Sequence, residues 1–367
     1  MAGTGALGYR VHETAALDPG HGAAFDPWQR WREEPGPLGA VAAALLAANP
    51  HNTQPWQFAV RDTEVDLYAD PDRTTGSLDP YLREQHVGLG CALENLVLAC
   101  RARGLQPDVT LLPNETDPTW VAHVVLNTSV PRDDVLHEAI PSRHTDRGPF
   151  GPGTLSAAEL ADLVDATDLP GVQVQWLDSP QDVATLGEVL VDAATALVAD
   201  DDQSRDGFVW FRGTDAEVQR YADGLTLDAQ GLSPLMLTAA KLLPPSTRAA
   251  GDTFWLDQTR DVHTATAAAY GVITVPDVDD RGAQLVAGRL LQRVHLTATD
   301  RGVSLQHMNQ ITERIDRARV TGARDTFAPR LAALLPPGGR PLVAFRVGLP
   351  TRETRSSPRR PLAAVVR

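Results

Sequence analysis

Two segments of similar sequence lie 198 residues apart, and this internal repeat constrains the fold more than any other feature of the chain. Residues 90–105 read GCALENLVLACRARGL and residues 288–303 read GRLLQRVHLTATDRGV, and both are typical of an amphipathic helix that ends at a glycine. Upstream, the apolar stretches 38–48 and 155–166 correspond at an offset of about 118 residues. The chain is therefore expected to contain two related halves. The alternative is a chance similarity between two amphipathic helices.

The pattern of apolar residues predicts helices and strands in both halves, and hence an α+β fold with a sheet covered by helices in each. Alternating runs at 56–60 and 64–69, joined by Arg-Asp-Thr, are typical of a hairpin. An N-cap aspartate followed by proline predicts a helix over 79–104, and Ser156 with Glu159 predicts a capping box that opens a helix to about residue 166. The remaining predicted strands are 109–112, 120–126, 172–177, 270–275, 303–308 and 342–347, and the remaining helices are 37–48, 132–139, 182–198, 283–301 and 325–335.

The repeat divides the chain into an N-terminal arm and two related halves. Residues 1–36 are rich in Gly, Pro and Ala and form the arm, whose Phe25, Trp28 and Trp31 are expected to dock on the body. The first half is 37–140 and the second is 141–367. Because the second half is longer by about 80 residues, an insertion is placed around 200–280, where the periodicity weakens and a lid is plausible.

Charge and composition exclude several classes of function. The 367 residues carry a formal net charge of −14, the wrong sign for a nucleic-acid binder. The longest apolar run, 38–48, is shorter than the roughly 20 residues of a membrane span, so a cytoplasmic protein is expected. Cys91 and Cys100 lie on one predicted helix, roughly 13 Å apart, which is too far for a disulfide. The histidines lack a ligand-type spacing, and no metal site is expected.

Residues 49–56 read Asn-Pro-His-Asn-Thr-Gln-Pro-Trp and concentrate amide side chains at the end of an apolar helix. Carboxamides both donate and accept hydrogen bonds, so they suit a ligand edge on which donors and acceptors alternate, such as the pyrimidine end of a flavin. The alternative is a polar turn that leads into a strand.

Residues 141–147 read Pro-Ser-Arg-His-Thr-Asp-Arg and place two arginines, a histidine and a threonine in one loop of an acidic protein. Guanidinium groups and a hydroxyl match the geometry of a phosphate. The alternative is a solvated run of charges. Residues 355–360 form a second basic cluster that could serve the same purpose. The alternative is that they belong to a disordered tail.

With these motifs the sequence resembles the nitroreductase-like superfamily of FMN-binding flavoproteins, and in particular its fused, single-chain Acg-type branch. The resemblance rests on residues 48–56, on 143–147, and on Pro-Arg-Arg-Pro-Leu-Ala-Ala-Val-Val at 358–366, and it spans residue 37 to the C-terminus. Other members are homodimers with FMN at the subunit interface. The resemblance therefore implies a pseudo-dimer with one complete FMN site, because only the first half keeps the amide loop and only the second half has the arginine loop.

The resemblance also implies a role for each site residue. Arg143 and Arg147 would face the FMN phosphate or the polar edge of the ring, with His144 and Thr145 beside them. Arg359, or alternatively Arg360, would complete the phosphate clamp. Residues of the amide loop would contact the ring system (Asn49, Pro50, Asn52) or brace the loop (Gln54). Asn309 and Gln310 correspond to a loop over the flavin, with the Gln310 N–H near flavin N5. Both positions depart from the Glu-Gly of many members, and Asn49 replaces the usual Ser. No catalytic side chain is assigned, since the flavin carries the redox chemistry.

The function expected from this resemblance is two-electron, hydride-transferring oxidoreduction through FMN, with NADPH or NADH possible as electron donor and a small-molecule substrate. The expected state is a monomer that is a pseudo-dimer, and further oligomerisation is left open. A second hypothesis is an FMN-sequestering protein whose insertion at 200–280 closes over the ring. A third is a globular scaffold without cofactor, which would make both polar clusters incidental.

Overall fold

The first sheet is antiparallel and is formed by residues between 56 and 128. The computed structural model of the protein describes residues 10–11, 13–164, 168–244 and 246–367. Its first sheet has the order β1-β2-β4-β3, with every neighbouring pair antiparallel. The strands are β1 (Trp56–Arg61), β2 (Glu64–Ala69), β3 (Leu105–Leu111) and β4 (Trp120–Thr128). The predicted hairpin at 56–69 is confirmed, with Arg61 paired to Glu64 across the turn.

The second sheet repeats this order of strands. It runs β6-β9-β11-β10, again antiparallel, and β5 (Phe150–Gly151) pairs with the far end of β11. The strands are β6 (Gln173–Leu177), β9 (Ala269–Val275), β10 (Ser304–His307) and β11 (Arg340–Pro350). If β5 is left aside, each sheet has four strands, of which the first along the chain pairs with the second, the second with the fourth, and the fourth with the third. The predicted α+β class is confirmed.

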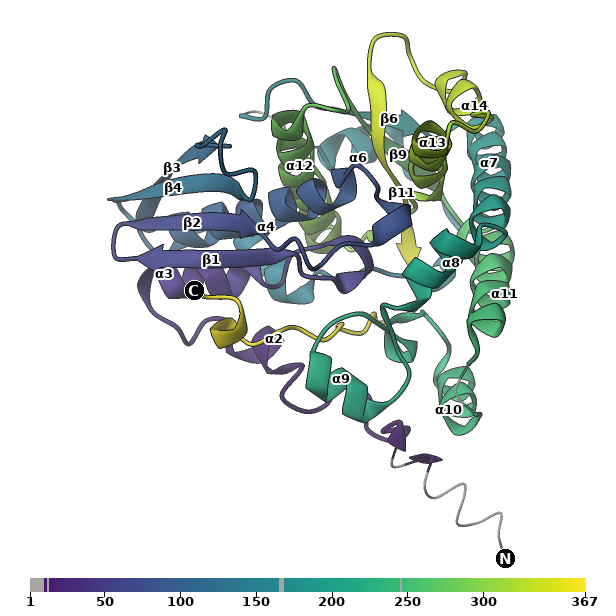
Figure 1. Ribbon diagram of the computed structural model, residues 1–367, viewed down its shortest axis with the longest axis horizontal. Helices are drawn as coiled ribbons and strands as arrows, with labels where there is room; N and C mark the ends of the chain where they lie inside the picture. Colours follow the sequence, from purple (N-terminus) through teal and green to yellow (C-terminus); the bar gives the residue numbers. More distant parts are fainter. Residues whose placement is uncertain (1–9, 12, 165–167, 245) are drawn as a thin grey trace, which may run out of the picture.

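Two 20-residue helices lie between the sheets (Figure 1). α4 (Arg83–Ala102) and α12 (Arg281–Asp300) pack against each other through buried residues, and each leads into its strand through a glycine with positive φ. These glycines are Gly104 (φ 72°) and Gly302 (φ 69°), the left-handed positions at which a glycine suits a helix end. Cys91 and Cys100 are both buried on α4 as free thiols, as the sequence predicts.

The chain makes a long helical excursion between β6 and β9. α7 (Pro180–Val198) packs on the second sheet through Leu186, Val189 and Leu190. The chain then leaves the sheet for α8 (Asp201–Phe208), α9 (Asp215–Tyr221), α10 (Pro234–Leu242) and α11 (Arg248–Gln258). We refer to residues 200–263 as the insertion, since the strand at 270–275 is a central member of the sheet.

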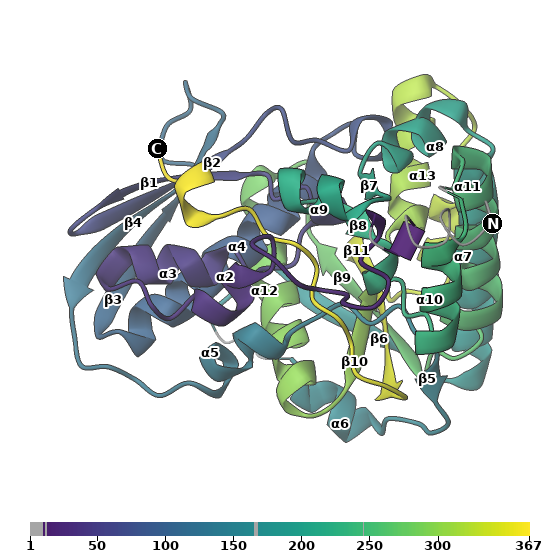
Figure 2. The same cartoon turned by 90° about the horizontal axis from the view of Figure 1, so that it is seen from below.

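Both terminal segments cross the molecule. The arm includes α2 (Asp26–Arg30) and leads into α3 (Gly36–Ala44), and Phe25, Trp28 and Trp31 are buried as expected. Figure 2 shows the C-terminal segment running from β11 past α9 and α2 toward the first sheet. There Val366 forms a parallel bridge with Phe58 of β1. The C-terminal segment is therefore ordered and is not a disordered tail.

Several helix boundaries differ from the prediction. α4 begins at Arg83, four residues after the predicted start, because Leu82 adopts a left-handed φ of 58° and the Asp79 carboxylate instead accepts a hydrogen bond from the Gln85 N–H. The capping box at Ser156 is confirmed, but α6 (Ala157–Asp162) is short, and the predicted end near 166 lies outside the described residues. The helix predicted at 325–335 is limited to α14 (Ala328–Ala332).

Two further helices lie next to predicted site residues in the sequence. α5 (Val135–Ala139) agrees with a predicted helix, whereas α13 (Gln310–Thr321) was not predicted from the sequence. Within the described residues no helix has the length and apolar character needed to cross a membrane.

Candidate functional site

The amide loop between α3 and β1 has an unusual backbone. Residues His51, Asn52 and Gln54 all have positive φ, at 47°, 55° and 52°. Non-glycine residues rarely adopt this region, and such strain is concentrated at ligand-binding and catalytic sites. The loop also packs on α4, where a Cβ at Gly88 would lie 3.1 Å from the Asn49 Cβ. The strained conformation is therefore held in place by a buried helix.

The amide side chains of this loop bind other parts of the protein. Asn49 accepts a hydrogen bond from the Gln54 backbone N–H at 2.8 Å. Gln54 is completely buried, and it donates to Ala222 O at 2.8 Å and accepts from the Arg360 N–H at 2.8 Å. Asn52 donates to Pro358 O at 2.9 Å and accepts from Arg359 Nη1 at 2.7 Å. The bracing role of Gln54 and the contact of Asn49, Pro50 and Asn52 with a ring stay predictions.

Arg143 and Arg359 are buried cations at the end of this loop. Each is 2% exposed. Arg143 donates to Leu46 O at 2.8 Å and lies 3.3 Å from His295 Nδ1, and Arg359 also reaches Ala47 O. Among the described residues neither guanidinium pairs with a carboxylate, and the Nε atom of each is buried without a hydrogen-bond partner. Burial lowers the pKa of Arg143 to about 10, and burial followed by the charge of Arg143 lowers the pKa of Arg359 well below its usual value.

Arg147 adds a third positive charge to this cluster, and several neutral histidines lie beside it. Arg147 is half-buried and donates to Ala229 O at 3.1 Å. Burial, followed by Arg147, lowers the pKa of His51 to about 4, and burial, followed by Arg143 and Arg359, lowers the pKa of His144 to about 3. Burial, followed by the charges of Arg143 and Arg147, lowers the pKa of His307 to about 3. These imidazoles are therefore neutral near pH 7, and the arginines carry the charge of the site.

The insertion covers the amide loop and the arginine loop. Besides the bond from Gln54 to Ala222, the Gly224 N–H donates to Asn52 O at 3.1 Å. Gly231 (φ 68°) lies against the backbone of 147–148, where a Cβ would come within 2.2 Å of Gly148 N, so that no other residue fits. Gly207 of α8 lies near the His51 ring, since a Cβ added at Gly207 would lie 3.8 Å from His51 Nε2. Residues 222–231 thus join the two predicted binding loops.

The other predicted site residues occupy different surroundings. Thr145 is half-buried in the arginine loop. Asn309 accepts a hydrogen bond from the Ala344 N–H at 3.1 Å, and Gln310 is the buried first residue of α13, three positions after His307. Arg360 donates to Ala364 O at 2.8 Å and lies 3.8 Å from Asp70, so of the two arginines it is Arg359 that joins Arg143.

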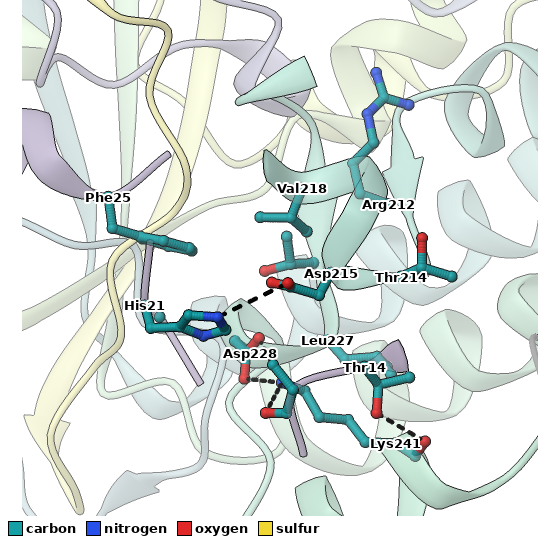
Figure 3. A pocket seen from close by; sticks show the side chains of 14 residues that line it. Thr14, His21, Phe25, Arg212, Thr214, Asp215, Val218, Leu227, Asp228 and Lys241 are labelled. Atoms are coloured by element: carbon teal, nitrogen blue, oxygen red, sulfur yellow. Dashed lines mark hydrogen bonds and ion pairs between the residues drawn. The ribbon is translucent and has the colours of Figure 1, made fainter. Parts of the chain in front are cut away.

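A separate small cavity lies between the arm and the insertion. Figure 3 shows His21 and Asp215 facing each other across it, 3.8 Å apart, with Lys241 paired to Asp228 at 2.8 Å nearby. Its volume is about 20 Å³, which suits water only. In the part of the chain that the structure describes, no group of three or more His, Cys, Asp or Glu side chains is placed to hold a metal ion.

Sequence reasoning missed several residues of the cluster. His51 and His307 lie inside two of the motifs described above. Their proximity to Arg147 depends on contacts between segments that are distant in the sequence. Trp28, which lies edge-on to His144 with ring centroids 4.6 Å apart, carries no local signal beyond being an aromatic residue in the arm.

Comparisons with known proteins agree with the resemblance in the motifs. No family model matches the chain. The chain is 28% identical over 334 residues to the Mycobacterium tuberculosis protein named "Putative NAD(P)H nitroreductase Rv3131", covering 89% of each chain. It is 35% identical over 117 residues to "Putative NAD(P)H nitroreductase acg" of the same organism, covering 30% of this chain and 34% of that protein.

Solved structures are more distant. The nitroreductase with bound FMN of Desulfitobacterium hafniense is 16% identical, with a TM-score of 0.36 over 63% of this chain and 95% of that chain. Nitroreductase A of Vibrio parahaemolyticus is 11% identical, with a TM-score of 0.34 over 64% and 75% of the two chains. Because these scores lie below 0.5, the relationship rests on the sequence matches. The near full-length match to the mycobacterial protein confirms the resemblance of this chain to the nitroreductase-like superfamily and to its Acg-type relatives.

Proposed function

We propose that the protein is an FMN-dependent oxidoreductase of the nitroreductase type, with NADPH or NADH as electron donor. The observation that carries the proposal is the pair of buried arginines, Arg143 and Arg359, which have no carboxylate partner among the described residues. A buried cation is costly unless an anion or a polar network compensates it. Full-length relatedness to a protein named as an NAD(P)H nitroreductase supports the same function.

The residues of the cluster suit the phosphate end of FMN. Arg143, Arg147 and Arg359 supply positive charge, and the buried Nε atoms of Arg143 and Arg359 are donors still without partners. Guanidinium donors form short, charge-assisted hydrogen bonds with phosphate oxygens. The neutral imidazoles of His144 and His307 add polar contacts without adding charge. We infer that this cluster holds the phosphate and that the amide loop holds the ring.

We also propose that the chain consists of two fused halves, 37–140 and 141–367, after an arm at 1–36. The identical order of strands in the two sheets and the packing of α4 on α12 support this division. In this arrangement the amide loop belongs to the first half and the arginine loop opens the second half. One site per chain follows, because each half supplies only one of the two loops.

The chemistry divides between cofactor and protein. FMN, when bound, supplies two-electron transfer as hydride. The arginines bind and orient it, the strained amide loop presents backbone groups beside α4, and residues 222–231 of the insertion exclude water from the space between the loops. Gln310 is the first residue of α13, and the N-terminus of this helix would favour negative charge that develops close to it. No side chain is proposed as a catalytic acid or base.

The visible spectrum of the purified protein tests the proposal. We expect flavin absorbance, one FMN released by heat per chain, and bleaching on anaerobic addition of NADPH or NADH. Protein that binds no flavin after incubation with FMN would exclude the proposal, and two FMN per chain would exclude the single site.

A second candidate function is flavin sequestration. It is favoured by the hydrogen bonds that tie the insertion to Gln54 and Asn52, since a cover over the ring would block a nicotinamide. Hydride transfer needs donor and acceptor atoms within about 3–3.5 Å. FMN that stays oxidised with NADPH and NADH but is bleached by dithionite would favour sequestration over turnover.

A further inference from the structure

Trp28 of the arm contacts two residues of the predicted phosphate cluster. Its indole is 8% exposed, lies edge-on to His144 with ring centroids 4.6 Å apart, and has the guanidinium carbon of Arg359 4.7 Å above the ring. The indole Nε1–H donates to Ser357 O at 2.7 Å. One side chain therefore touches the arginine loop and the C-terminal segment together.

The arm holds the C-terminal segment at a second point. The Arg359 N–H donates to Ala24 O at 2.7 Å. Ser357 and Arg359, on either side of Pro358, are thus both bound to the arm through backbone groups. With its backbone held, Arg359 directs Nη1 to Asn52 Oδ1 at 2.7 Å and keeps Nε buried without a partner.

The arm is also bound to the insertion. The Gln219 amide of α9 donates to His21 O at 2.8 Å and accepts from the Ala24 N–H at 3.2 Å. Ala24 and Phe25 of the arm pack with Val218 and Ala222 in a small apolar cluster of their own. Ala222 in turn accepts the hydrogen bond from Gln54. The arm therefore lies between the insertion and Arg359.

We propose that Trp28 is a positioning residue that holds Arg359 and His144 toward the anionic end of the ligand, an inference that rests on the proposed function. An aromatic face stabilises a guanidinium that has lost its water without neutralising it. A carboxylate in the same place would stabilise Arg359 more strongly but would cancel the charge that a phosphate needs. The indole thus suits a buried arginine that is kept charged for a ligand.

Trp31, three residues after Trp28 at the C-terminal end of α2, offers a matched control. It is also a buried tryptophan, 4% exposed, and it also lies edge-on to a histidine, His137, with ring centroids 5.1 Å apart. Its cation is Arg32, which pairs with Glu138 and is not part of the phosphate cluster. Trp28→Leu and Trp31→Leu therefore remove similar apolar packing and differ in their contact with Arg359.

The first measurement is the dissociation rate of FMN and of riboflavin, followed by recovery of flavin fluorescence. We expect Trp28→Leu to release FMN about 10-fold faster and riboflavin less than about 2-fold faster, because the lost contact acts through the phosphate. Trp28→Phe keeps the aromatic face and should restore most of the FMN affinity. Trp31→Leu should leave the ratio of the two rates unchanged. Equal effects of Trp28→Leu and Trp31→Leu on both flavins would overturn the inference.

The second measurement needs no flavin. Hydrogen exchange of the Arg359 amide, which is bonded to Ala24 O, should accelerate about 10-fold or more in Trp28→Leu and remain at the wild-type rate in Trp31→Leu. Unchanged exchange in Trp28→Leu overturns the positioning role, whatever the flavin results are. Wild-type protein that binds no flavin overturns the proposed function instead, so the two failures are distinguishable.

Discussion

Gly90 and Gly288 face each other where α4 crosses α12, and each occupies the place where the other helix leaves no room for a side chain. A Cβ on Gly90 would lie 2.1 Å from Leu285 O, and a Cβ on Gly288 would lie 2.0 Å from Val87 O. Residues 87 and 90 correspond to 285 and 288 at the offset of 198, so the contact is reciprocal. This is the relationship expected at an isologous interface between two copies of one unit.

The glycine contact leads to the first prediction. Gly90→Ala and Gly288→Ala should each lower the free energy of unfolding by about 3 kcal/mol, because the clashing atoms belong to helix backbone and cannot rotate away. Gly251→Ala on α11 is the control, since its Cβ meets only Phe208 at 3.6 Å. That variant should be neutral or gain up to about 1 kcal/mol from helix propensity. Urea unfolding measures all three, and a fully stable Gly90→Ala protein would contradict the observed crossing.

The second prediction concerns Arg143. Arg143→Met should weaken FMN by about 10- to 150-fold and riboflavin far less, since a charge-assisted hydrogen bond contributes roughly 1.5–3 kcal/mol. The flavin-free protein should keep its melting temperature or gain, because the variant removes a buried charge that no carboxylate among the described residues compensates. Calorimetric titration and thermal melts measure the two effects.

Arg103→Met is the matched control for this prediction. Arg103 follows the other end of α4 and is partly buried against Ala99 O. Its replacement should leave both flavin affinities unchanged. Equal losses of FMN and riboflavin in Arg143→Met would remove the phosphate role.

The third prediction concerns pH and the carboxyl pair formed by Glu84 and Glu313, in the first turns of α4 and α13. Burial raises the pKa of Glu313 from its usual 4.5 to about 8, and burial followed by Glu313 raises the pKa of Glu84 well above its usual value. These two carboxyl groups therefore bind more protons in the folded protein than in the unfolded chain between pH 4.5 and 8, whereas buried histidines with a lowered pKa, such as His51 and His144, bind fewer. The contribution of the carboxyl pair to stability falls across this window as pH rises, by up to about 1.4 kcal/mol per pH unit for each proton.

Glu313→Gln should remove the contribution of this side chain and should be more stable than the wild type above pH 8, because the amide stays neutral. The stability of Glu313→Gln relative to the wild type should therefore rise from pH 5 to pH 9. Glu188→Gln, at an exposed position of α7, should follow the wild-type curve. Chemical denaturation at pH 5, 7 and 9 gives the comparison, and a difference between Glu313→Gln and the wild type that does not change with pH would contradict the prediction.

The fourth prediction concerns the cover formed by the insertion. Asp223 holds the turn at 222–224 by accepting hydrogen bonds from Arg73 at 2.9 Å and Arg212 at 2.7 Å. Asp223→Asn should loosen the turn that binds Gln54 and Asn52, and should raise the anaerobic rate of flavin bleaching by NADPH or dithionite several-fold. Asp201→Asn breaks the pair with Arg248 in the same insertion, outside residues 222–231, and should not change the rate. Identical rates in a folded, FMN-loaded Asp223→Asn protein would show that this turn does not guard the flavin.

The sequence by itself determined several local structures and the resemblance to a superfamily. The hairpin at 56–69, the capping box at Ser156 and the left-handed glycines after α4 and α12 were predicted because each depends on a few adjacent residues. The repeat at an offset of 198 predicted that α4 and α12 are related, and the motifs at 48–56 and 143–147 predicted the superfamily to which the comparisons point.

The tertiary structure decided everything that depends on residues distant in the chain. It selected Arg359 over its neighbour Arg360 to join Arg143, and it showed that Asn52 and Gln54 bind the C-terminal segment and the insertion across about 170 to 307 residues. It also placed Trp28 against Arg359 and showed α13, whose buried face carries Glu313 and Asp316 beside Ile311. Local sequence patterns report propensity and amphipathicity. They carry no information about which distant side chain fills the space beside a buried charge, because that depends on how the two sheets and their connecting segments pack.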